Sequence, residues 1–139
     1  MFKKKKKKQV NPGQVIFPVN DPNPPEKHEV DVAFILASHF ESPVEFILPV
    51  DDFKRKSADI KLLGVEWEIK SPKGSSKVTI KNQFQRASKQ AKNIIIDTRR
   101  TKLKFEAIEK SVLFEMSKRL YIKRVILIDK SKKVIEVLR

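Results

Sequence analysis

The chain contains no cysteine and only three glycines, Gly13, Gly64 and Gly74. The missing thiols exclude a disulfide framework and any thiolate metal site. Three glycines at these wide spacings exclude a glycine-rich loop for a nucleotide phosphate. Long hydrophobic runs are also missing, and none approaches the roughly 20 residues that would span a bilayer. The lysine-rich start, residues 1–8, lacks the apolar stretch of a secretory signal.

Acidic residues are scarce relative to basic ones, and this imbalance is the clearest signal in the composition. The 139 residues include 31 Lys and Arg against 17 Asp and Glu, which gives a net charge of +14. The lysine run 3–8 supplies six of these charges, so a net charge of +8 would remain without it. The partner expected of such a chain is a polymer of phosphates or an anionic membrane surface.

The first 25 residues differ in character from the rest of the chain. They combine the lysine run with five prolines, a composition that predicts a disordered or extended arm. Within this arm, residues 15–17 could form a short edge strand or a hydrophobic clip. Residues 26–139 are predicted to form one domain, because their number suits a single modest core.

Hydrophobic periodicity predicts the elements of this domain. Val30, Ala33, Phe34 and Ala37 recur at helical spacing, which predicts a helix over 26–40. Further helices are expected at 78–92 and 105–120, and strands at 44–48, on both sides of Gly64, and at 93–97, 122–128 and 134–138. The order α-β-β-β-α-β-α-β-β predicts an α/β fold with a mixed central β-sheet flanked by helices.

The residues with the most chemical potential lie on the two strands around Gly64. Asp59 stands at the head of the first strand, and Glu68 and Lys70 share one face of the second. A hairpin can bring Asp59 beside Glu68, and two carboxylates with an ammonium can hold a divalent cation and assist attack on a phosphodiester. The alternative is a solvated strand face of alternating charge, and Glu66 is expected to be such a surface charge.

With this order of elements, Asp59 and the run Glu68-Ile69-Lys70 resemble the PD-(D/E)xK nuclease superfamily. The longer pattern over 58–72 and 89–97 is similar to the C-terminal tRNA-nuclease domains of contact-dependent growth-inhibition toxins. One departure is Ala58, which stands where the superfamily motif has proline. The resemblance implies a restriction-endonuclease-like core.

The resemblance also implies roles for individual residues in metal-dependent phosphodiester cleavage. Asp59 and Glu68 would be metal-binding acids, and Lys70 would position the attacking water or stabilise charge. Glu29, on the first predicted helix, would be a third acid near the metal, although a glutamate at a helix start also serves the helix dipole. Mg²⁺ is the expected cation, with Mn²⁺ or Zn²⁺ as alternatives.

Polar residues of the predicted helix 78–92 and its approach are expected to contact a nucleic acid. The basic ones would bind the phosphate backbone, and the glutamine could orient a water or a phosphate or belong to a plain polar face. Such phosphate contacts weaken with salt and carry no sequence information. The residues concerned are Lys77, Lys81, Arg86, Lys89 and Gln90.

Several functions therefore remain open at the level of sequence. The first is a metal-dependent endonuclease, which the resemblance directs to tRNA or another structured RNA. The alternatives are a DNA endonuclease of the same fold, a non-catalytic nucleic-acid-binding module, and a protein that binds anionic membranes through its lysine run. The toxin resemblance implies delivery into a target cell as part of a larger secreted protein, action in the cytoplasm, and an acidic immunity protein as partner.

Overall fold

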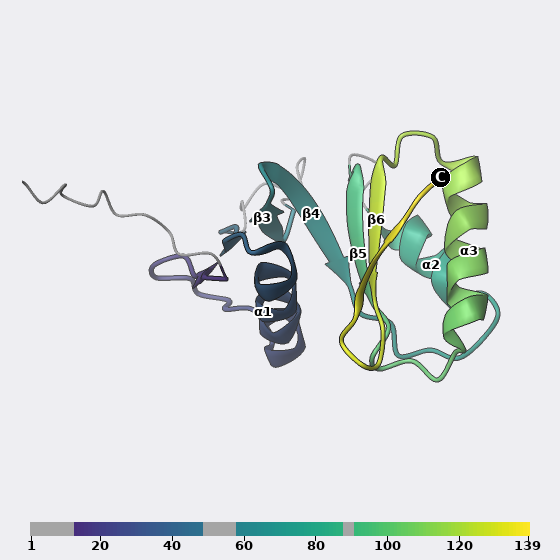
Figure 1. The fold of residues 1–139 in the computed structure, drawn as a ribbon, viewed down its shortest axis with the longest axis horizontal. Helices are drawn as coiled ribbons and strands as arrows, with labels where there is room; N and C mark the ends of the chain where they lie inside the picture. The colour runs from purple at the N-terminus through teal and green to yellow at the C-terminus, as the bar shows by residue number, and fades with distance from the viewer. Residues whose placement is uncertain (1–12, 49–57, 88–90) are drawn as a thin grey trace, which may run out of the picture.

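The residues that a computed structural model describes, 13–48, 58–87 and 91–139, form three helices and seven strands (Figure 1). The helices are α1 (Lys27–Phe40), α2 (Thr79–Arg86) and α3 (Phe105–Lys118). The strands are β1 (Val15–Ile16), β2 (Val44–Phe46), β3 (Ile60–Leu62), β4 (Val65–Lys70), β5 (Asn93–Asp97), β6 (Arg124–Ile128) and β7 (Val134–Val137). The predicted α/β order is confirmed, with β1 added before it and with α2 shorter than expected.

All seven strands belong to one mixed sheet in which their spatial order is their chain order. β2, β3 and β4 form an antiparallel meander, β4, β5 and β6 run parallel, and β7 returns antiparallel to β6. Helices α2 and α3 make the two crossovers between the parallel strands. The carboxyl ends of β4, β5 and β6 therefore meet at one side of the sheet, here called the carboxyl edge, which is where α/β sheets commonly bind ligands.

The apolar run of β5 is buried on both faces of the sheet, as its sequence predicts. Ile95 packs into the core beneath α1, while Ile94 and Ile96 pack into a second core beneath α2 and α3. Neighbouring β6 divides in the same way between the two cores, because successive side chains of a strand point to opposite faces. The helices thus cover opposite faces, α1 over the amino-terminal half of the sheet and α2 and α3 over the carboxyl-terminal half (Figure 1).

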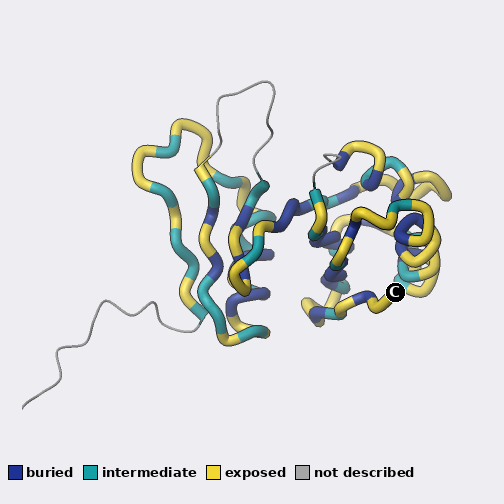
Figure 2. The backbone as a smooth tube through the Cα atoms, turned by 90° about the horizontal axis from the view of Figure 1, so that it is seen from above, coloured by how far each residue is buried: buried dark blue, intermediate teal, exposed yellow. Residues whose placement is uncertain are grey.

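The face of the amino-terminal half opposite α1 is exposed. Buried and exposed residues alternate along β2 and β3 (Figure 2). Glu45, Lys61 and Glu66 stand next to one another across the three strands of the meander, and all three are exposed. The prediction that Glu66 is a surface charge is confirmed.

Helix α1 follows its predicted apolar stripe except at Phe34. Ala33 and Ala37 are buried and Val30 packs against the core, whereas Phe34, expected in the core, is 51% exposed. Val32 and Leu36 are buried in addition. The position of the sheet decides which neighbours of a helical stripe are buried with it.

The turn between β3 and β4 fixes the register on which the candidate site depends. Leu63 and Gly64 have φ values of 56° and 78°, the left-handed pair of a two-residue hairpin turn. This turn pairs Ile60 with Trp67, where the regular register ends. The Asp59 N–H also donates to the Trp67 carbonyl at 3.0 Å, and the Ile69 N–H donates to the Asp59 carboxylate at 2.7 Å, so Asp59 lies beside β4 at Trp67 and Ile69.

The amino-terminal segment joins the sheet through β1, which pairs in parallel with β2. The Phe17 ring stacks on Phe46 with the centroids 5.3 Å apart. This arrangement matches the edge-strand alternative for residues 15–17, whereas the division into an arm and a domain after residue 25 stays a prediction. In the described part of the chain, no helix is both long and apolar enough to cross a membrane.

Candidate active site at the carboxyl edge

Three predicted residues meet where β3 begins and β4 ends. The Asp59 carboxylate accepts a hydrogen bond from the Ile69 N–H, and Glu68 and Lys70, on either side of Ile69, share one face of β4. The Lys70 Nζ lies 3.4 Å from Glu68 Oε2. The Glu68 side chain is only 5% exposed and that of Lys70 15%, so the alternative of a solvated charged strand face does not hold here.

Glu68 is an unusual residue for the middle of a sheet, because its carboxylate is buried with little compensation. The Oε2 atom has no hydrogen-bond partner among the described residues, and Lys70 approaches it at ion-pair distance without hydrogen-bond geometry. A buried carboxylate is costly unless its oxygens are bonded or paired. An oxygen left in this state is suited to ligate a cation.

The Asp59 carboxylate also lacks sufficient counter-charge. Burial raises the pKa of Asp59 to about 6, although the N–H of Ile69, which donates to Oδ2 at 2.7 Å, acts in the opposite direction. The carboxylates of Glu29 and Glu68 raise this pKa further, and the Lys70 ammonium lowers it. A cation added beside Asp59 would favour its ionised form.

Glu29 lies near this pair, but the structure also gives it another task. Its Oε1 accepts a hydrogen bond from the Glu26 N–H at 2.9 Å, as part of a capping box at the start of α1. Its charge still reaches Asp59, whose pKa it raises. No three acidic or histidine side chains of the described residues are grouped closely enough to hold a metal ion. A metal role for Glu29 therefore stays a prediction.

The donor set suits a hard cation. Asp59 and Glu68 offer carboxylate oxygens, and Mg²⁺ is commonly bound by one or two carboxylates with water and phosphate completing its shell. Mn²⁺ accepts the same ligands, whereas Zn²⁺ sites more often use cysteine and histidine. The buried oxygen of Glu68, which has no hydrogen-bond partner among the described residues, is the observation that favours a cation here.

A buried ion pair that the sequence did not point to supports the same edge. Asp97, at the end of β5, is fully buried. The Arg99 guanidinium donates two hydrogen bonds to its carboxylate, from Nε to Oδ1 at 2.8 Å and from Nη2 to Oδ2 at 2.9 Å. Ser71, the residue after Lys70, donates its hydroxyl to Asp97 Oδ2 at 3.2 Å. The hydrogen bond to Asp97 raises the pKa of Arg99, so the guanidinium stays charged.

The same guanidinium ties α1 to the carboxyl edge. Arg99 Nη2 donates to the His28 carbonyl at 3.3 Å, and Nη1 lies 3.8 Å from Asp31 Oδ2. These contacts hold the first turn of α1, and with it Glu29, against the sheet. The only signal in the sequence was an aspartate ending an apolar strand and followed closely by arginine, which is too common a pattern to indicate a site.

Comparison with known proteins identifies the family. A family model described as the contact-dependent growth inhibition CdiA C-terminal domain matches residues 56–134, more than half of the chain. The chain belongs to this family. The matched range includes Asp59, Glu68 and Lys70 and leaves out α1 with Glu29. No curated protein matches the chain.

A solved structure is similar to this toxin domain over nearly its whole length. The CdiA-CT/CdiI toxin and immunity complex from Burkholderia pseudomallei contains a chain with a TM-score of 0.62 and 16% sequence identity. The match covers 91% of the present chain and 99% of the other. At this identity the likeness shows the fold alone, and membership in the PD-(D/E)xK superfamily stays a prediction.

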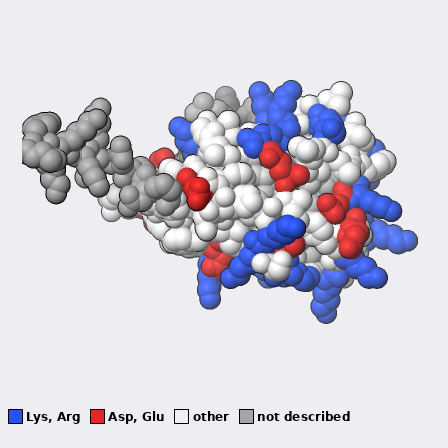
Figure 3. Space-filling model, viewed as in Figure 1, with Lys and Arg blue, Asp and Glu red and all other residues white. Residues whose placement is uncertain are grey.

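The predicted nucleic-acid contacts of the toxin domain lie partly on α2. Lys77, Lys81 and Arg86 are exposed. The first two line a shallow groove of about 320 Å³ between the start of α2 and the exposed ring of Phe114 on α3. Lys89 and Gln90 lie outside the described residues. Basic side chains gather below the end of β4 and around the α2 and α3 half in Figure 3, and their role in binding stays a prediction.

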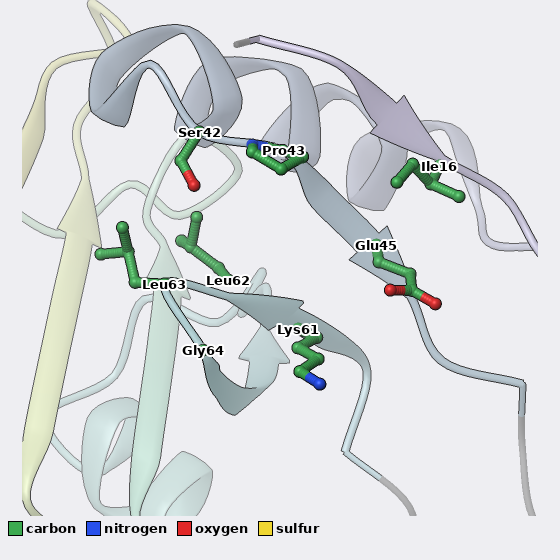
Figure 4. A pocket seen from close by; sticks show the side chains of 8 residues that line it. All are labelled: Ile16, Ser42, Pro43, Glu45, Lys61, Leu62, Leu63 and Gly64. Carbon is green, nitrogen blue, oxygen red and sulfur yellow. The ribbon is translucent and has the colours of Figure 1, made fainter. Parts of the chain in front are cut away.

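A second depression, of about 220 Å³, lies at the opposite end of the hairpin (Figure 4). It is bounded by β1, β2 and the turn at Gly64, away from Asp59. Its charged lining consists of Glu45 and Lys61, which neighbour each other across the sheet. A single carboxylate is too small a set of acidic ligands, so this depression offers no second metal site.

Proposed function

We propose that this toxin domain is a metal-dependent nuclease that hydrolyses phosphodiester bonds of tRNA or another structured RNA. The observation that carries the proposal is the buried Oε2 of Glu68, which has no hydrogen-bond partner among the described residues, lies 3.4 Å from the Lys70 ammonium and belongs to a carboxylate that raises the pKa of nearby Asp59. Family membership supports the toxin part of the proposal, and the net charge of +14 supports a polyanionic substrate.

The chemistry follows from the charges at this edge. Asp59 and Glu68 would hold the cation, which when bound polarises a phosphoryl oxygen and lowers the pKa of a water molecule. Lys70 would donate hydrogen bonds to the charge that develops on the attacked phosphate or hold the attacking water in place. Its partial burial strengthens these interactions, because water screens them less. Losing such a donor typically costs about 10² to 10³ in rate.

The choice of RNA over DNA rests on the resemblance to tRNA-nuclease domains. The decisive experiment incubates the purified chain with total tRNA and with plasmid DNA, in Mg²⁺, in Mn²⁺ and in EDTA. We expect cutting of tRNA that requires the metal. Cutting of plasmid alone would identify a DNA endonuclease, and binding without cutting in any metal would identify a non-catalytic binding module.

Matched substitutions test whether the proposed residues are required for cutting. Glu68→Gln and Lys70→Ala should abolish cutting or reduce it by about 10² or more. Glu45→Gln and Lys61→Ala are suitable controls, because they make the same chemical changes at exposed, mutually paired positions of β2 and β3. Equal losses in the two sets would contradict the proposed site.

An acidic immunity protein is the proposed partner of this basic toxin domain. The similar fold from Burkholderia pseudomallei is part of a toxin and immunity complex, and the charge of the present chain favours an acidic binder. The domain would be delivered as part of a larger secreted protein and act in the cytoplasm of the target cell. An acidic protein encoded next to it should bind it with equal stoichiometry and block cutting.

The lysine run proposed for membrane binding lies outside the described residues.

A further inference from the structure

The loop between β5 and α3, residues 98–104, carries the basic run Arg99 to Lys102 that the proposed chemistry does not use. It is fixed to its surroundings at consecutive residues. Arg99 donates two hydrogen bonds to the Asp97 carboxylate. The Thr101 hydroxyl donates to the Gly74 carbonyl at 2.5 Å. Lys130, from the β6–β7 turn, donates to the Thr101 carbonyl at 2.5 Å. Thr101 itself is fully buried, so the loop is held in place by burial and by hydrogen bonds to three other segments.

Arg100 projects from this loop toward the proposed site. One Nη2 hydrogen bond reaches the Ser71 carbonyl at 2.7 Å, and Ser71 directly follows Lys70. A guanidinium has five N–H donors, so four remain available. Arg100 is exposed, and no carboxylate of the described residues forms an ion pair with it. A planar guanidinium that is positioned by one hydrogen bond and keeps its other donors available is suited to bind a phosphate.

Two lysines stand on either side of the bond between the loop and the segment that follows β4. Lys73 precedes Gly74, and Lys102 follows Thr101, whose hydroxyl bonds to that glycine. Both lysines are exposed, and within the described residues neither has an ion-pair partner. The nearby Asp97 is already engaged by Arg99. The edge therefore presents positive charge that no internal pair neutralises.

We propose that Arg100, Lys73 and Lys102 form a phosphate-binding site for the nucleic-acid backbone beside Lys70. The proposal rests on the proposed function for the identity of its ligand, and it adds a binding surface distinct from that expected on α2. Because the loop is already ordered, little conformational entropy is lost when it binds. The site would hold a phosphate that flanks the bond to be cut and so set which bond reaches Lys70.

The experiment measures binding of fluorescein-labelled tRNA in EDTA by anisotropy across a salt series. Lys73→Ala/Lys102→Ala is compared with Lys118→Ala/Lys123→Ala, which removes the same charge from the end of α3 and from the residue before β6, at the opposite edge. We expect the first pair to bind several-fold more weakly and to lower the slope of log K against log salt by about 1.4 to 1.8. The control pair should leave the slope within error of the wild type.

Equal effects of the two pairs would overturn the proposal, because binding would then follow net charge alone. Unchanged binding in the Lys73→Ala/Lys102→Ala variant would overturn it as well. Arg100→Lys keeps the charge but loses the fork, and it should also weaken binding. Melting curves by circular dichroism check that each variant folds.

The binding assay needs no metal and no cutting, so its outcome is independent of the proposed nuclease activity. If the wild type binds through these residues but cuts nothing, the phosphate site stands and the nuclease proposal fails. If the wild type cuts tRNA, the Lys73→Ala/Lys102→Ala variant should show a raised KM with an unchanged kcat. Cutting with an unchanged KM would overturn the phosphate site alone.

Discussion

At the scale of single residues, the candidate site is marked by carboxylates that the fold does not fully compensate. Asp59 has a raised pKa, and Glu68 buries an oxygen without a hydrogen-bond partner. Such groups cost stability, and they persist where a ligand or a reaction makes use of them. Substitutions at these two residues should therefore raise the stability of the metal-free domain while lowering its activity.

Asp59→Asn should stabilise the metal-free domain while abolishing cutting. In the folded state the pKa of Asp59 is about 6 against an ordinary 3.8, so ionised Asp59 disfavours folding. This cost is complete above about pH 6 and disappears below about pH 4, where both states are protonated. Asparagine keeps an acceptor for the Ile69 N–H. Thermal melts in EDTA should show the gain at pH 8 and none near pH 4, and a loss at pH 8 would contradict it.

Metal binding should depend on pH for the same reason. A cation at Asp59 and Glu68 must displace the proton that Asp59 holds below about pH 6. Mg²⁺ or Mn²⁺ should therefore raise the melting temperature more at pH 8 than at pH 5, as ligands of the native state do. Glu68→Gln should remove most of this stabilisation. A metal-induced shift that is equal at both pH values would argue against Asp59 as a ligand.

At the scale of elements, the β3–β4 hairpin sets the geometry of the site. Its turn holds Leu63 and Gly64 at positive φ, and the resulting register pairs Ile60 with Trp67, the chain neighbours of Asp59 and Glu68. A slip of one residue would move every side chain of β3 to the other face. The identity of two turn residues therefore controls whether the carboxylates meet.

Gly64→Val should destabilise the domain by about 1 to 2 kcal/mol, because a β-branched residue is strained at a φ of 78°. Gly64→Asn should cost less, since asparagine tolerates this conformation. No atom lies within 4 Å of a side-chain carbon added at this position, so crowding does not enter the comparison. Urea unfolding measures the free energy of unfolding of both variants. Equal losses would contradict the prediction that a β-branched side chain strains this turn.

Helix α3 shows how an element can depend on a residue far from it in sequence. Arg139 donates from Nη2 to the carbonyls of Met116, Arg119 and Ile122, at 3.3, 3.4 and 2.5 Å. A guanidinium at this position satisfies carbonyls at the helix end and favours the helix dipole. Arg139→Ala should cost about 1 kcal/mol in urea unfolding. Arg139→Lys should recover part of it, and an unchanged midpoint for Arg139→Ala would contradict the capping role.

At the scale of the whole molecule, the Asp97–Arg99 pair joins parts that are distant in the chain. It links the end of β5 to the first turn of α1 and to Ser71 after β4. Buried pairs rarely stabilise more than apolar residues would, but their geometry is directional. The pair therefore fits a role in holding the carboxyl edge in one arrangement.

Removing one partner of this pair should be more damaging than removing both. Arg99→Leu leaves the carboxylate of Asp97 buried without its cation and should cost about 3 to 5 kcal/mol. The double variant Asp97→Leu/Arg99→Leu should recover much of that loss in urea unfolding. It should nevertheless cut tRNA more slowly than the wild type if the pair positions the site. Additive losses would show that the two residues do not act together.

The sequence by itself determined the elements and the residues of the candidate site. The alternation of Trp67 and Ile69 with Glu68 and Lys70, and the unbroken apolar run of β5, are local patterns that depend on the periodicity of a strand. Asp59 could be proposed as a partner of Glu68 because the residues around Gly64, between them in the chain, also predict a hairpin turn.

Only the tertiary structure decided which faces and which pairs these patterns produce. Phe34 was expected in the core and is exposed, while Glu115 is buried beside Arg119. The Asp97–Arg99 pair and the raised pKa of Asp59 likewise arise from groups brought together from separate elements. Periodicity fixes what one segment can present, but burial and charge pairing depend on what other segments place against it.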